Sequence, residues 1–241
     1  MYQQFKKNMK TTDLKNVFFK PYVGNEYENG LILKEDGIIE AGTEEKKGLK
    51  VMVLGESHYC GEKCKDCGIA SSYVENKCKE FTKNVVTSYL DYLNDKTEFE
   101  PWMNTFTKFS KALTGKDERS KDIWKSIIYY NYIQRAMNTA RTRPDSDDFK
   151  ESEDAFFDIL QEYKPNVIIC WGNRLFDNLP SKNGDYGKII AIGERKYYTW
   201  YYQLKGFKAS LLSIYHPSVG FNWESWNKVI IEFFKNINHE L

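Results

Sequence analysis

Four short apolar runs along the chain predict the buried strands of one sheet. The runs cover residues 50–54, 127–133, 167–170 and 208–214. Apolar residues at consecutive positions are typical of strands that are buried on both faces, as in parallel sheets. The second run also fits a short helix, but its β-branched and aromatic residues favour a strand. We therefore expect a sheet with four parallel strands.

Between these runs, apolar residues recur with the period of a helix. The first such stretch places Phe81, Val85, Tyr89 and Leu93 on one stripe. The predicted helices cover residues 80–94, 101–114, 151–163 and 226–237. With right-handed crossovers between parallel strands, this alternation predicts an α/β fold, a three-layer sandwich of helices around a central four-stranded parallel sheet.

The length of the chain fits a single domain over residues 1–241. Residues 1–49 are polar and rich in turn-forming residues, so we interpret them as a partly ordered lead-in. Residues 60–78 form a cysteine-bearing insert after the first strand. Residues 188–192 and 197–204 predict an antiparallel ribbon.

The charge balance limits how the protein can bind nucleic acid. Lys and Arg number 35 and Asp and Glu number 34, which gives a net charge of +1. This balance excludes a strong global attraction to DNA, so any DNA contact must be local. The chain has no apolar stretch of about 18 residues and no signal peptide pattern. We therefore expect a cytoplasmic protein with no membrane partner.

Polar residues follow the predicted strands at the ends where each strand stops. Residues 55–59 follow the first strand, Asn131 lies near the end of the second, Gly172 follows the third and His216 follows the last. The carboxyl ends of parallel strands converge on one crevice of an open α/β sheet. The sequence therefore predicts one shared site built from distant segments.

The loop after the first strand resembles a motif of the uracil-DNA glycosylase superfamily. That motif reads Gly-Gln-Asp-Pro-Tyr-His in the best-known branch of the family. Gly55 and Tyr59 match it, while Glu56, Ser57 and His58 replace Gln, Asp and Pro. The family's iron-sulfur branch also has Glu at the position of Glu56.

Three further segments follow the family's order. Residues 216–218 match the first three positions of its last motif, His-Pro-Ser-Pro, and Val219 replaces the final Pro. Residues 127–131 are similar to the strand that ends in a base-reading Asn, and residues 167–172 to the strand that ends in Trp-Gly. The resemblance spans roughly residues 50 to 220 and implies the strand order 2-1-3-4.

The resemblance implies roles for the residues of the predicted site. His216 would donate a hydrogen bond to the carbonyl oxygen of the departing base, and Asn131 would read the base edge. Tyr59 would form a wall of the pocket beside Gly55, and Ser218 would bind a phosphate. Each residue also has an ordinary interpretation, such as a loop His, a turn Asn or a packing Tyr.

Water activation departs from the family pattern. Ser57 stands where many members have Asp, and a hydroxyl is no general base near neutral pH without a stronger base beside it. Glu56 supplies a carboxylate one residue away. Phe221 and Trp223 follow the last loop, where the family carries an apolar wedge. Packing against the C-terminal helix is the other interpretation of these two aromatic residues.

The cysteine-bearing insert predicts a metal site. Its four cysteines are Cys60, Cys64, Cys67 and Cys78. Disulfides are disfavoured in the cytosol, where clustered cysteines usually bind metal. Zinc is the first expectation, an iron-sulfur cluster the second and an unmetallated cluster the third. Cys170, which is flanked by apolar residues, is predicted to be a buried thiol.

These patterns lead to three functional hypotheses. The first is a monomeric DNA glycosylase-like enzyme that flips a pyrimidine-type base out of single- or double-stranded DNA and hydrolyses its N-glycosidic bond. The second is a catalytically weak nucleic-acid or nucleotide binding module on the same fold. The third is a hydrolase that uses Ser57 with His58 or His216, although the loop lacks the second Gly of a Gly-x-Ser-x-Gly elbow.

Overall fold

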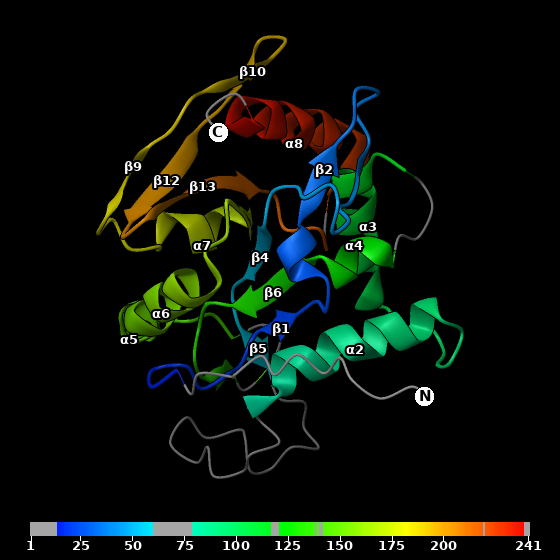
Figure 1. Cartoon of the computed structure of the whole chain (residues 1–241). Helices are drawn as coiled ribbons and strands as arrows, with labels where there is room; N and C mark the ends of the chain where they lie inside the picture. The colour runs from blue at the N-terminus through cyan, green and yellow to red at the C-terminus, as the bar shows by residue number, and fades with distance from the viewer. Residues whose placement is uncertain are drawn as a thin grey trace.

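The computed structural model describes residues 14–59, 79–116, 121–137, 139, 142–218 and 220–238. It is a mixed α/β fold with a large central sheet between two layers of helices (Figure 1). In spatial order the strands of this sheet are β1 (Tyr22–Val23), β6 (Ile127–Asn131), β4 (Val51–Gly55), β8 (Val167–Trp171), β13 (Phe207–Ile214), β12 (Thr199–Leu204) and β9 (Gly184–Tyr186).

The centre of the sheet is parallel and its edges are antiparallel. β6 pairs with β4, β4 with β8 and β8 with β13 in parallel register. β1 adds to β6, and β12 and β9 add beyond β13, all in antiparallel register. The prediction of a four-stranded sheet is therefore wrong in its strand number. The extra edge strands β1 and β9 have only two and three residues, too few to show a hydrophobic period.

Two hydrophobic clusters cover the two faces of the sheet. One cluster joins the sheet to α2 (Phe81–Leu93), α3 (Met103–Thr114), α4 (Asp122–Lys125) and α8 (Trp223–Asn238). The other joins it to α5 (Ser146–Glu151), α6 (Glu153–Tyr163) and α7 (Asn173–Asp177). Within the sheet, successive residues of β4 alternate between the clusters, as a strand that is buried on both faces requires.

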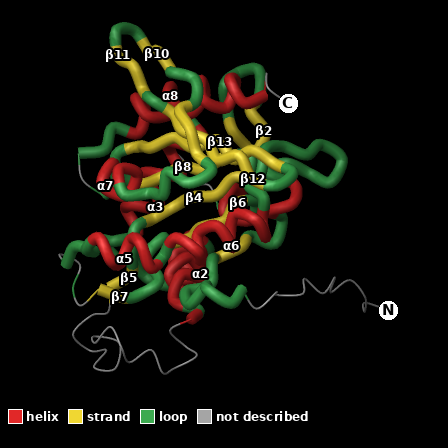
Figure 2. The backbone as a smooth tube through the Cα atoms, turned by 90° about the vertical axis from the view of Figure 1, so that its left-hand side faces the viewer, coloured by secondary structure: helices red, strands yellow, loops and turns green. Residues whose placement is uncertain are grey.

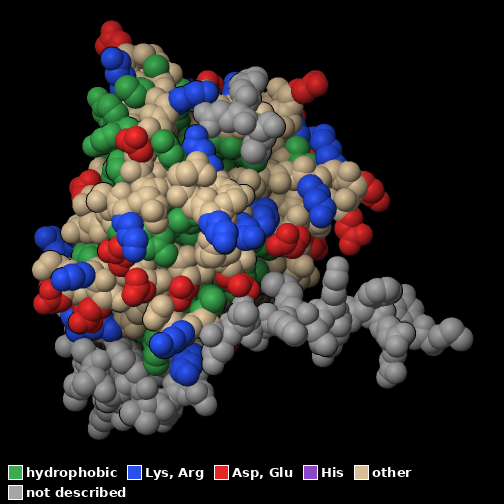
Figure 3. Space-filling model, turned by 60° about the vertical axis from the view of Figure 1, so that its left-hand side comes forward, with side chains coloured by type: hydrophobic (Ala, Val, Ile, Leu, Met, Phe, Trp, Pro, Cys, Tyr) green, Lys and Arg blue, Asp and Glu red, His purple; other side chains and the backbone are tan. Residues whose placement is uncertain are grey.

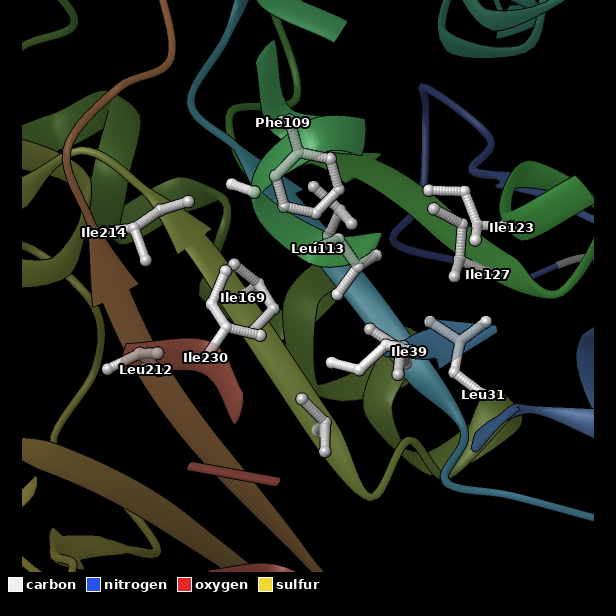
Figure 4. Close-up of a cluster of buried hydrophobic side chains, with 14 of the residues drawn as sticks. Leu31, Ile39, Phe109, Leu113, Ile123, Ile127, Ile169, Leu212, Ile214 and Ile230 are labelled. Carbon is white, nitrogen blue, oxygen red and sulfur yellow. The ribbon is translucent and has the colours of Figure 1, made fainter. Parts of the chain in front are cut away.

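The first cluster is built from aliphatic strand residues and the apolar stripes of the helices. Figure 4 shows Phe109 and Leu113 of α3 and Ile230 of α8 among Ile169 and Leu212 of the sheet. Each of these side chains is fully buried, and burial of a residue of this size stabilises the fold by about 1.5 to 3 kcal/mol. This packing fixes the strands that carry the site.

Local signals explain where the helices end. α3 stops at Gly115, which has a left-handed backbone conformation with φ of 71° and donates its N–H to the carbonyl of Lys111. α6 stops at Lys164, which is followed by a proline. The face of α2 is rotated by about one residue from the prediction, because Val86 rather than Val85 is fully buried.

The remaining strands form three small pairs. They are β2 (Leu31–Leu33) with β3 (Ile39–Ala41), β5 (His58–Tyr59) with β7 (Ala136–Met137), and β10 (Ile190–Ile192) with β11 (Arg195–Tyr197). Figure 2 shows the β10 and β11 hairpin projecting from the end of the molecule opposite the β5 and β7 pair. The predicted ribbon is thus corrected, since β12 pairs with β13 rather than with residues 188–192.

The lead-in belongs to the fold from Leu14 onward. It contributes β1 to the main sheet, the β2 and β3 pair, and a short 3-10 helix over Tyr27–Asn29. Leu31 and Ile39 are fully buried in the first cluster. No helix within the described residues combines the length and apolarity needed to cross a lipid bilayer.

Candidate functional site

The carboxyl ends of the four parallel strands meet at one edge of the sheet. β4 ends at Gly55, β6 at Asn131, β8 at Trp171 and β13 at Ile214. Gly55 pairs with Asn131, and Trp171 pairs with Ile214. The structure therefore brings the loop after β4 and the loop after β13 to the same edge, as the topology of an α/β sheet requires.

Gly55 leaves the space that the side chain of Asn131 occupies. A Cβ atom at position 55 would lie 2.1 Å from Oδ1 of Asn131 and 2.7 Å from the hydroxyl of Tyr129. The backbone of Gly55 is not in the left-handed region, so glycine is needed here for space. Asn131 is only 4% exposed, and its Oδ1 has no hydrogen-bond partner among the described residues.

Replacing Gly55 with Ala should destabilise the protein by about 1 to 3 kcal/mol, because the added methyl group forces the Asn131 amide to move. Chemical denaturation measures the loss. In a background that already carries Asn131→Ala, the same methyl group should cost little, because the atom that it meets is gone. An unchanged free energy of unfolding in Gly55→Ala alone would contradict the close packing.

His58 lies beside Asn131 in an apolar enclosure. The rings of Phe19 and Phe81 approach it edge-on, with centroid distances of 5.0 Å and 4.6 Å. Nε2 of His58 lies 2.7 Å from Oγ1 of Thr82, and Nδ2 of Asn131 lies 3.0 Å from Nδ1 and 3.2 Å from Nε2. Burial lowers the pKa of His58 to about 3, so the ring is neutral.

His216 follows β13, and Ser218 fixes the orientation of its ring. The backbone N–H of Ser218 donates to Nδ1 at 3.3 Å, and the Ser218 hydroxyl lies 2.8 Å from the same atom. A backbone N–H can only donate, so Nδ1 is an acceptor and the proton of the neutral ring lies on Nε2. The Ser218 carbonyl accepts from Nζ of Lys108 at 3.3 Å, which ties this loop to α3.

The imidazole of His216 is exposed yet partly desolvated. Its ring packs edge-on against Trp171, with a centroid distance of 5.9 Å. Desolvation lowers the pKa of His216 from its ordinary value of 6.5, Glu56 acts to raise that pKa, and Arg174 acts to lower it. The ring is therefore neutral near pH 7 and offers Nε2–H as a hydrogen-bond donor.

Glu56 is held by an arginine from the neighbouring strand's loop. Nε of Arg174 donates to Oε1 of Glu56 at 2.7 Å, and a terminal nitrogen of Arg174 donates to Oε2. The pair is bidentate, which fixes the plane of the carboxylate. Each carboxylate oxygen keeps a lone pair for a water molecule. The electrostatic effect of both residues on His216 shows that the three groups share one site.

The other predicted site residues are placed differently. Tyr59 is 48% exposed on β5, and no described contact joins it to Asn131 or His216. Ser57 is partly exposed, and within the described chain it makes no hydrogen bond to either of these histidines or to His58. This geometry disfavours a hydrolase with Ser57 as its nucleophile. The hydroxyl and N–H of Ser218 face His216, so phosphate binding by Ser218 stays a prediction.

The aromatic residues after the last loop differ in placement. Phe221 is buried and stacks on Trp226, with ring centroids 6.2 Å apart and an interplanar angle of 6°. This supports the packing interpretation for Phe221 over a wedge that enters DNA. Trp223 begins α8 and is partly buried.

The predicted metal ligands Cys60, Cys64, Cys67 and Cys78 lie outside the described residues. In the part of the chain that is described, no group of three or more His, Cys, Asp or Glu residues is arranged to hold a metal ion. Cys170 is a buried thiol, as predicted. Burial raises the pKa of its thiol, which keeps it unreactive.

Surface charge and shape add little to the site. On the face drawn in Figure 3, basic and acidic side chains are intermixed, in keeping with the balanced composition. A small hollow of about 20 Å³ lies between β12, β13 and α8, lined by residues such as Thr199, Ser210 and Phe233. It has room for a single water and touches none of the residues described above.

Sequence reasoning missed three residues of this site. Arg174 lies in the polar segment after the third parallel strand, where the convergence of strand ends gives a signal for it. His58 is in the first loop, but its replacement of Pro drew attention away from a role of its own. Thr82 is part of α2, and only the tertiary structure brings it to His58.

Comparison of the chain with protein-family models gives no match, and comparison with curated proteins finds no significant relative. A function for this protein must therefore be argued from the arrangement of Glu56, Arg174, Asn131, His58 and His216.

Proposed function

We propose that the protein is a DNA glycosylase-like enzyme that flips a pyrimidine-type base into the carboxyl edge of the sheet and hydrolyses its N-glycosidic bond. The observation that carries the proposal is the orientation of His216, whose Nε2–H is available at the edge that also holds Glu56 and Asn131. The strand order β6-β4-β8-β13 supports it. Numbered along the chain, these strands run second, first, third and fourth, which is the order that the resemblance implies.

Each group has a distinct task in this reaction. When the bond between the sugar C1′ and the base nitrogen breaks, the electron pair leaves with the base. Nε2–H of His216 donates to the base carbonyl oxygen, where negative charge grows. Water then attacks C1′, and the carboxylate of Glu56, held in place by Arg174, accepts a proton from it. The products are a free base and an abasic sugar.

A panel of oligonucleotides tests the proposal. Each carries one uracil or one modified pyrimidine, in single-stranded and in duplex form, and alkali then cleaves the strand at any abasic site. We expect strand cleavage for at least one base, and we expect Glu56→Gln to slow it while the oligonucleotide still binds. Absence of cleavage across the panel, at protein in excess of DNA, would refute the enzymatic activity.

A binding module on the same fold is the second candidate, and one observation favours it. Both oxygens of Glu56 are engaged by Arg174, and Ser57 stands beside it in place of an Asp. A carboxylate paired in this way is a weaker base than a free one. Binding of the same oligonucleotides without cleavage, unchanged by Glu56→Gln, would assign the protein to this class.

We also propose that Cys60, Cys64, Cys67 and Cys78 bind one zinc ion, with an iron-sulfur cluster as the alternative. The sequence between them has few apolar residues, so metal-thiolate bonds are the available source of ordering free energy. Because Cys60 follows Tyr59, metal removal should lower both activity and thermal stability. Elemental analysis after purification without added metal checks the prediction, and absorbance at about 400 nm distinguishes the cluster. Four freely titratable thiols with no bound metal would contradict it.

A further inference from the structure

The side-chain amide of Asn131 is held by a chain of buried polar groups. Its Nδ2 lies 3.0 Å from Nδ1 of His58, and Nε2 of His58 lies 2.7 Å from Oγ1 of Thr82. Asn131 and His58 are each 4% exposed, and Thr82 is fully buried. Water therefore does not compete for these contacts, which makes their hydrogen-bond geometry decisive.

The positions of the protons follow from what each group can do. An amide nitrogen can only donate, so the ring nitrogen facing it must accept. His58 is neutral and carries one proton, which then lies on Nε2 and is donated to Thr82. The opposite tautomer would place the N–H of His58 against the N–H of Asn131. Of the two tautomers, only the one with Nε2–H avoids that conflict.

This chain commits one half of the Asn131 amide and leaves the other half unpaired. The donor half faces His58, while Oδ1 lies against Gly55 without a hydrogen-bond partner in the described part of the chain. A buried acceptor without a partner destabilises the fold, and a ligand that supplies a donor recovers that free energy. A free Asn would offer a donor and an acceptor together, whereas this one offers only an acceptor.

We infer that His58 determines base specificity, by holding Asn131 so that the site presents a single acceptor and therefore takes bases with a ring N–H at that point. This inference rests on the proposed function and deepens it. His58 touches no substrate and acts through Asn131, so it is a positioning residue. A base with a methyl group on that nitrogen leaves Oδ1 unpaired and is rejected. The neighbouring carbonyl of the base is not read by Asn131, so changes there are tolerated.

The first arm of the test is independent of any activity. In wild-type protein with ¹⁵N-labelled histidine, long-range nitrogen-proton correlation spectra report the tautomer of His58. We expect a protonated Nε2 and an unprotonated Nδ1. A protonated Nδ1 would reverse the amide of Asn131 and overturn the inference, whatever the enzyme does.

The second arm measures binding and excision with single-stranded oligonucleotides that carry uracil, N3-methyluracil or 4-thiouracil. Wild-type protein should disfavour N3-methyluracil by about 5- to 150-fold relative to uracil, the range expected for one unpaired buried group. It should treat 4-thiouracil within a few-fold of uracil. Equal handling of uracil and N3-methyluracil would overturn the inference.

Two variants separate positioning from general destabilisation. His58→Leu removes the acceptor that holds Nδ2 and should erase the discrimination against N3-methyluracil. His58→Asn keeps a side-chain oxygen close to the place of Nδ1 and should retain it. If His58→Leu does not fold, the wild-type spectra and His58→Asn still decide the question, because loss of discrimination in His58→Asn would count against the inference.

Failure of the inference and failure of the proposed function give different results. Cleavage of oligonucleotides together with a protonated Nδ1 leaves the function standing and removes the role of His58. Absence of binding and cleavage together with a protonated Nε2 removes the function and the base specificity that was built on it.

Discussion

Replacement of His216 with Ala should lower base excision by about 10²- to 10³-fold without unfolding the protein. The proposed role of its Nε2–H is to meet negative charge on the leaving base, and this charge exists only as the bond breaks. Loss of such a donor removes about 3 to 4 kcal/mol of transition-state stabilisation. His216 is exposed, so its truncation should change the free energy of unfolding little.

Two further variants make the His216 result specific. His216→Gln keeps an N–H donor near the reach of Nε2 and should lose less activity than His216→Ala. Ser218→Ala removes the hydroxyl near Nδ1 but leaves the backbone N–H that sets the tautomer, so its effect should also be smaller. Single-turnover excision rates measure all three. A wild-type rate in His216→Ala would exclude His216 from the chemistry.

The central strands were predictable from sequence because they are buried on both faces. The apolar runs at 50–54, 127–133, 167–170 and 208–214 correspond to β4, β6, β8 and β13. The edge strands escaped prediction for a physical reason. β1 and β9 are short, and their pairing depends on neighbours that the local sequence does not specify. β12 was recognised as a strand, but an apolar pattern does not name its partner.

The site divides in the same way between what sequence reveals and what it does not. Parallel topology alone brings Gly55, Asn131 and the loop with His216 to one edge, and that much follows from sequence. The polarity of the Asn131 amide does not. It depends on Thr82, a residue of α2 that nothing in the local sequence marks as part of the site. Hydrogen-bond networks of this kind arise only from tertiary packing.

The two histidines of the site are both neutral, for the same reason, and they use their protons in opposite directions. Desolvation lowers the pKa of each ring. Nδ1 accepts in both rings, from Asn131 in His58 and from Ser218 in His216. His58 donates its proton inward to Thr82, whereas His216 keeps its proton for the open edge of the sheet. One imidazole therefore serves the scaffold and the other serves the proposed reaction.

The neutrality of His58 should make the stability of the protein depend on pH. The unfolded chain binds a proton at this residue near pH 6.5, whereas the folded protein does so only near pH 3. Between these values the unfolded state holds more protons, so the free energy of unfolding falls as the pH falls. The slope is about 1.4 kcal/mol per pH unit, and the full contribution of about 5 kcal/mol is present above pH 6.5.

Comparison with His58→Asn isolates this contribution, since Asn does not titrate and every other ionisable group is common to both proteins. Between pH 7.5 and pH 5.0, the stability advantage of wild type over His58→Asn should shrink by about 2 kcal/mol. Urea denaturation at several pH values provides the measurement. Parallel stability curves for the two proteins would mean that His58 accepts a proton in the folded state as readily as in the unfolded chain. That result would also remove the neutral ring on which the fixed orientation of Asn131 depends.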